Sequence, residues 1–88
     1  MAKIRRHSAR LATQIEDAAS SIAANVAEGN RRVGKDRLHL FRVAAGSADE
    51  MRTHLRVAEA WGYVTMDDVD TSLQLADREL AMLSRLTR

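Results

Sequence analysis

The residues of this chain best suited to chemistry are four cations crowded into the stretch 30–37. Guanidinium and ammonium groups bind phosphate oxygens, and Asn30 and Gly34 allow the backbone of this stretch to approach a phosphate closely. Because the chain has only three aromatic residues, we expect such binding to follow the nucleic-acid backbone and to depend on salt rather than on base stacking. The cations predicted to contact RNA or DNA are Arg31, Arg32, Lys35 and Arg37.

Charge is distributed unevenly along the sequence. The first 37 residues carry a net charge of +4 and the remaining 51 carry −2, which accounts for the formal net charge of +2. Three interpretations fit this asymmetry: an end of the protein that faces nucleic acid, head-to-tail pairing between copies, or ordinary solvated helix faces.

Residues that commonly serve catalysis or metal binding are poorly arranged for either. His7, His39 and His54 lie far apart, and none has the helical spacing of paired metal ligands. The serines lack a glycine-framed nucleophile turn, and the absence of cysteine excludes disulfides and thiolate metal sites. We therefore predict that the protein is not an enzyme and holds no cofactor or metal.

Two segments of small residues, 21–29 and 41–50, interrupt otherwise apolar helix faces with polar side chains. An unsatisfied buried polar group costs about 1–3 kcal/mol, so buried polar residues of these segments need partners. We interpret them as a hydrogen-bond network between helices or between subunits that fixes their register; a ligand site is the alternative. The predicted helix-packing or oligomer interface comprises Ser21, Ala24, Asn25, Glu28, Ala44, Gly46, Ser47 and Glu50.

Hydrophobic periodicity predicts three long helices. Apolar residues recur at steps of three and four over Ser8–Glu28, with Ser8 as the N-cap. Gly29 and Asn30 supply the stop, because either residue tolerates the left-handed conformation that closes many helices. The second helix is expected over Lys35–Ala60, with Gly46 favouring close contact with another helix.

The end of the second helix and the start of the third carry clear signals. Gly62 is the expected C′ residue that follows the second helix. Thr65 and Asp68 resemble a capping box, and a regular apolar stripe then continues towards the carboxyl terminus. The third helix is therefore predicted to begin just after Thr65.

Length and composition place the chain in a broad class. Eighty-eight residues without a proline favour a single all-α domain over 1–88, folded as an antiparallel helical bundle. No apolar run approaches the ~20 residues of a membrane span, and the basic amino terminus is not followed by the apolar core of a secretory signal. We expect a soluble cytoplasmic protein that does not enter membranes.

The two small-residue segments, in this order and followed by a Gly-Tyr turn, resemble those of the bacterial four-helix-bundle proteins known as 23S rRNA intervening-sequence proteins. Ala23 stands where that family has a proline, which puts any kink there in question. The family usually has a further helix before this point. We therefore expect either a shortened member of the family or a sequence whose assigned start lies downstream of the true start. A bundle without that helix would have an apolar groove that favours self-association. The matching residues are Ser21, Ile22, Ala24, Asn25, Ala27, Glu28, Gly29, Phe41, Ala44, Gly46, Ser47, Glu50, Gly62 and Tyr63.

The resemblance implies a homo-oligomer, since relatives of the fold form homopentameric barrels. A structurally similar protein, the accessory subunit of diversity-generating retroelements, binds nucleic acid and a reverse transcriptase. Two functions therefore stay open: a homo-oligomeric scaffold or adaptor that binds a protein partner, and a nucleic-acid-binding accessory protein that uses residues 31–37. Because the second rests on analogy between folds, we rank it after the first.

Overall fold

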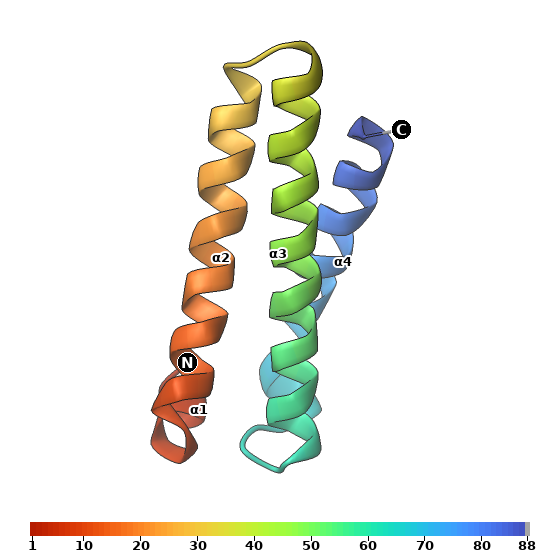
Figure 1. Ribbon diagram of the computed structural model, residues 1–88. Coiled ribbons are helices and arrows are strands. Elements are labelled where there is room, and N and C mark those ends of the chain that lie inside the picture. Colours follow the sequence, from red (N-terminus) through yellow and green to blue (C-terminus); the bar gives the residue numbers. More distant parts are fainter. Residues whose placement is uncertain (88) are drawn as a thin grey trace.

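The computed structural model describes residues 1–87 and is all-α over that range (Figure 1). Three long helices, α2 (Ala9–Asn30), α3 (Gly34–Ala60) and α4 (Met66–Leu86), follow a short helix α1 (Ala2–His7). The prediction of an all-α bundle with three long helices is confirmed. Helix α1, which has only six residues, was not predicted.

Ser8 separates α1 from α2 and acts as the predicted N-cap. Its backbone is extended, with φ −155° and ψ 101°, and its Oγ accepts a hydrogen bond from the Leu11 backbone N–H at 3.1 Å. The extended residue turns the chain so that α1 folds back and packs against α2. Periodicity could not reveal this break, because residues on both sides of Ser8 favour a helix.

The turn between α2 and α3 differs from the prediction. Gly29 is helical and buried, and α2 continues to Asn30, so neither residue provides a left-handed stop. Among residues 1–87, the positive φ angles belong to Gly34 (62°) and Gly62 (78°). The prediction for Gly62 is confirmed, since this glycine directly follows the C-cap residue Trp61.

Gly29 is buried because an aromatic ring packs directly on it. A Cβ atom placed on Gly29 would lie 2.6 Å from Cε1 and 2.8 Å from Cδ1 of Phe41. The Phe41 side chain is itself only 1% exposed. Gly29 therefore serves the close packing of α2 against α3, rather than the termination of α2.

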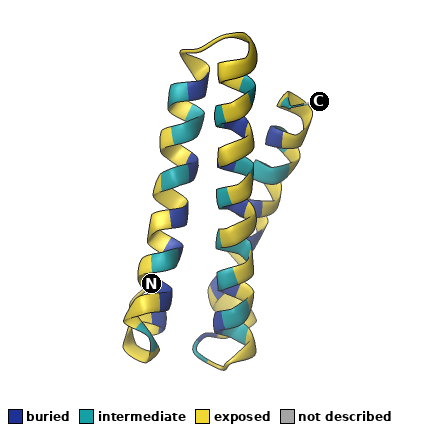
Figure 2. Cartoon of the chain, viewed as in Figure 1, coloured by how far each residue is buried: buried dark blue, intermediate teal, exposed yellow. Residues whose placement is uncertain are grey.

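The long helices form an elongated body in which α2 and α4 both pack against α3. The Cα atoms extend over 43 × 20 × 14 Å, and α1 lies at the end of the bundle where α3 turns into α4 (Figure 1). Buried residues line the inward faces of the helices, whereas the α2–α3 turn is exposed along its length (Figure 2). The larger core cluster is near α1 and consists of Ile4, Leu11, Ala12, Ile15, Leu55, Ala58, Val64, Val69 and Leu73.

The core is thinner towards the α2–α3 turn. There, a second buried cluster contains only Phe41, Ala44 and Leu83, with Val26 and Met82 packed against it. Six of the 16 buried apolar residues among residues 1–87 are alanines, which contribute little apolar area to the core. The half of the bundle next to the α2–α3 turn is therefore the more weakly packed half.

A hydrogen bond connects α4 to α3, and a capping box forms the start of α4. Arg52 of α3 donates from Nη1 to Asp77 Oδ1 of α4 at 3.2 Å and from Nη2 to Asp49 Oδ1 at 2.6 Å, and these bonds raise the pKa of Arg52. At the start of α4, the predicted capping box is present, with Asp68 N–H donating to Thr65 Oγ1 at 3.2 Å and Thr65 N–H donating to Asp68 Oδ2 at 2.9 Å.

Asp68 also links α4 to α1. Its Oδ1 accepts a hydrogen bond from Lys3 Nζ at 2.9 Å. The backbone hydrogen bond from Thr65 and then the contact with Lys3 lower the pKa of Asp68 from 3.8 to about 2. The negative charge of Asp68 is thus stabilised by the folded arrangement of three segments.

Candidate interaction sites

The first candidate site is the basic turn, residues 31–37, at the end of the α2–α3 hairpin (Figure 1). All seven residues are exposed, including Val33 with 83% of its surface accessible. The predicted cations therefore lie together at one end of the molecule. Their positions are compatible with contact to an extended polyanion.

Acidic neighbours compensate part of this positive charge. Glu28 Oε1 accepts hydrogen bonds from Arg32 Nε at 3.1 Å and Nη2 at 3.0 Å, and Glu28 Oε2 lies 3.8 Å from Arg31 Nη1. The Arg37 guanidinium carbon lies 5.2 Å from the centroid of the Phe41 ring. Lys35 forms no ion pair with any residue in the range 1–87.

An open depression of about 220 Å³ lies beside the basic turn. Its lining combines two acids, two potential cations and one apolar side chain, so it lacks the uniform positive charge of a phosphate pocket. The lining residues are Glu28, Arg32, Asp36, His39 and Leu40.

The second candidate site is the predicted polar network of the small-residue segments, and the structure brings part of it together. Ser21 Oγ of α2 and Ser47 Oγ of α3 are 2.7 Å apart. Asn25 Nδ2 donates to the Ser21 carbonyl at 2.8 Å and to Ser21 Oγ at 3.2 Å. These three half-buried residues connect α2 to α3 at a single register.

The two glutamates predicted for this network lie outside it. Glu28 pairs with the arginines of the basic turn, and Glu50 Oε1 lies 3.3 Å from His54 Nε2 on the same helix. Each glutamate finds its partner within one helical turn along the chain. Neither one connects α2 with α3.

The small residues of the predicted interface divide into inward and outward positions. Ala44 is completely buried in the core, whereas Ala24 and Gly46 are exposed. Apart from its own helix backbone and its two chain neighbours, no atom of residues 1–87 lies within 4 Å of the position that a Cβ on Gly46 would occupy. The predicted tight helix contact at Gly46 is therefore wrong within one chain, because this residue faces outward from α3.

The third candidate site is an apolar groove between α2 and α4, which we call the α2–α4 groove. It has a volume of about 470 Å³. One side is formed by small and apolar residues of α2, the floor by Met51 of α3, and the other side by Glu79 of α4. The α2 residues that line it are Ala19, Ile22, Ala23, Val26, Ala27 and Asn30.

The sequence predicted an apolar groove but not its lining. Ala19, Ala23 and Ala27 recur every four residues, which places them on one face of α2. This spacing was the available signal, and it was obscured because alanine fits both buried and exposed positions. The aromatic residues of the α3–α4 turn were not predicted as a candidate site. The signal available in the sequence was the close spacing of Trp61 and Tyr63, which are separated by one residue.

Residues 1–87 contain no group of three or more histidine, cysteine, aspartate or glutamate residues positioned to hold a metal ion. Over the same range, no helix is both long and apolar enough to cross a membrane.

Within residues 1–87, four packed helices and a cationic turn between α2 and α3 define a small all-α bundle protein. The family model described as 23S rRNA-intervening sequence protein matches residues 3–85. The chain belongs to this family, as its small-residue segments indicated. No curated protein and no solved structure matches the chain.

Proposed function

We propose that the chain is a self-assembling helical scaffold in which a second copy covers the α2–α4 groove. The observation that supports this proposal is the groove itself, because α2 and α4 both pack on α3 and leave an apolar channel between them. Small residues along α2 allow another helix to approach within the usual 8–10 Å between axes.

The packing of the chain favours a copy of the same chain as the occupant. The alanine-rich core stabilises the single chain weakly, and covering the groove adds buried area at roughly 25 cal/mol per Å². An assembly of this kind carries one basic turn per copy, so it offers a further partner several identical binding surfaces.

Substitution in the groove tests the proposal. Ala23→Glu places a carboxylate on an exposed groove position beside Glu79, and Ala81→Glu places the same group on an exposed position of α4 outside the groove lining. We expect the mass measured by light scattering to fall towards that of a monomer for Ala23→Glu and to remain unchanged for Ala81→Glu. A monomeric unsubstituted chain at micromolar concentration would overturn the proposal.

A second function, binding of RNA or DNA through the basic turn, is favoured by one observation. The four cations lie together on an exposed end, and among the described residues the ion pairs of Glu28 are with Arg31 and Arg32. Titration with RNA and with duplex DNA at several salt concentrations tests this function. The logarithm of the binding constant should fall with the logarithm of salt concentration, with a slope of about −0.9 for each duplex phosphate contacted. No binding at low salt would contradict it.

A further inference from the structure

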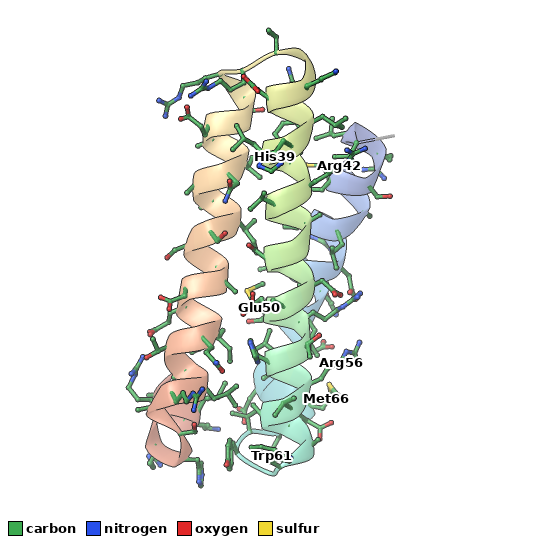
Figure 3. The ribbon with its side chains drawn as sticks, in the orientation of Figure 1. His39, Arg42, Glu50, Arg56, Trp61 and Met66 are labelled. Carbon is green, nitrogen blue, oxygen red and sulfur yellow. The ribbon has the colours of Figure 1, made fainter. Side chains whose placement is uncertain are left out.

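An aromatic cluster lies at the end of the bundle opposite the basic turn. The rings of His7 and Tyr63 stack with a centroid separation of 5.0 Å and an interplanar angle of 1°, and Trp61 meets Tyr63 edge to face at 5.8 Å. Tyr63 is half-buried and packs against the larger core cluster, whereas 68% of Trp61 is exposed. Trp61 lies at the C-terminal end of α3, next to the turn into α4 (Figure 3). Tyr63, which packs against the core, thus holds the solvent-exposed indole of Trp61 in place.

The segment that carries His7 is strongly cationic. Residues 1–15 contain four lysines and arginines and no acid. Lys3 pairs with Asp68 and Arg5 with Glu16, while Arg6 and Arg10 form no ion pair with the residues in 1–87. Arg6 is the chain neighbour of His7, and Arg10 follows three residues later. Through the stacking of His7 on Tyr63, the chain segment that carries Arg6 and Arg10 is held against the α3–α4 turn.

We propose that this end of the bundle binds single-stranded nucleic acid, with Trp61 stacking on an unpaired base and Arg6 and Arg10 contacting adjacent phosphates. An exposed aromatic ring next to cations is the arrangement that binds single strands, because every base offers a flat face and every linkage offers a negative charge. A duplex satisfies the cations equally well but hides the faces of its bases. The site therefore selects single strands over duplexes.

This inference is independent of self-assembly and of the basic turn. The aromatic cluster and the basic turn lie at opposite ends of α3, so substitutions can separate them (Figure 1). His7 already occupies one face of Tyr63, whereas Trp61 offers a large exposed indole surface.

The single tryptophan of the chain provides a direct probe. Fluorescence of Trp61 is recorded while a twelve-residue oligothymidylate is added at low salt, with an abasic oligonucleotide of equal length and a twelve-base-pair duplex measured in parallel. We expect saturable quenching by oligothymidylate, and binding weaker by about tenfold for the abasic strand, because the abasic strand keeps the phosphates and loses the stacking base. Equal binding of all three ligands would overturn the inference.

Variants complete the test, with a labelled oligothymidylate followed by fluorescence anisotropy. We expect Trp61→Leu to weaken binding by about tenfold and Trp61→Phe to retain most of it. Arg42→Gln, at an exposed α3 position outside the aromatic cluster and the basic turn, should leave the preference for oligothymidylate over the abasic strand unchanged. Circular dichroism checks that each variant remains helical. If Trp61→Leu loses helicity, the comparison of Trp61→Phe with the unsubstituted chain, together with the abasic strand, still decides the question.

Three further outcomes would contradict the inference: absence of quenching at low salt, binding that Trp61→Leu does not weaken, and a Trp61 emission that changes with protein concentration or anionic vesicles but not with oligothymidylate.

Discussion

Two glycines in α2 and α3 offer a matched test of the packing, because alanine meets opposite surroundings at the two positions. A Cβ on Gly29 lies 2.6 Å from the buried Phe41 ring, whereas a Cβ on Gly46 meets open space. We expect Gly29→Ala to destabilise the protein and Gly46→Ala to stabilise it. Both residues are helical with negative φ, so backbone strain does not enter the comparison.

The magnitude of each effect follows from two opposing contributions. Alanine is favoured over glycine in a helix interior by up to ~1 kcal/mol, the gain expected at Gly46. At Gly29 the gain is smaller because this residue lies in the last turn of α2, and the overpacked Phe41 ring costs about 1–3 kcal/mol. The free energies of unfolding of the two variants should therefore differ by at least about 1–3 kcal/mol. For a domain of this size, the difference in Tm is roughly 5 to 20 °C.

Thermal unfolding followed by circular dichroism, at one protein concentration for all variants, measures this difference. In a Phe41→Leu background the ring is absent, so the cost of Gly29→Ala should become smaller. A Tm for Gly29→Ala equal to or higher than the Tm for Gly46→Ala would refute the packing of Phe41 on Gly29. A Gly46→Ala variant that melts below the unsubstituted chain would show that another chain packs on the outward face of α3.

Two further predictions concern polar contacts between helices. The folded state lowers the pKa of Asp68 to about 2 from 3.8, so its ionised form contributes stability above pH 3.8 that is lost as the pH falls towards 2. The difference in free energy of unfolding between the unsubstituted chain and Asp68→Asn should therefore shrink over this range in urea titrations, and a difference independent of pH would contradict the role of Asp68. For the bond between Ser21 and Ser47, a double-mutant cycle with alanine at both positions should give a coupling of about 0.5–1.5 kcal/mol, with helix propensity cancelling. Additive effects of the two substitutions would show that this bond does not couple α2 to α3.

Local signals in the sequence predicted the helices well where they act through neighbouring residues. The capping box at Thr65 and Asp68, the N-cap at Ser8 and the C′ glycine at Gly62 depend on backbone groups within a few positions. Such contacts are encoded by residue type and spacing alone, and each was predicted correctly.

Signals that depend on distant residues were misinterpreted. Glycine is a residue type that often ends a helix, so Gly29 was predicted to end α2. Its actual role is set by the packing of Phe41 from α3, which exists only in the folded hairpin. Gly46 is the reverse case, because small size predicted a close contact and the helix orientation turned the residue outward. The sequence shows where the glycines are, but the direction in which each one faces depends on how the helices pack.

The candidate sites show the same division. The basic turn was predicted from four cations within seven residues, because residues close in sequence in an interhelical turn are close in space. The aromatic cluster joins His7 to residues more than fifty positions away, and the α2–α4 groove joins three helices. Only the tertiary arrangement brings these residues together.

The mass of the native protein tests the proposed self-assembly most directly. Light scattering coupled to size-exclusion chromatography should give an integral multiple of the 9.8 kDa chain at micromolar concentration, and Ala23→Glu should reduce this multiple. A mass of 9.8 kDa for the unsubstituted chain, unchanged by concentration, would contradict the proposal that a second copy covers the α2–α4 groove.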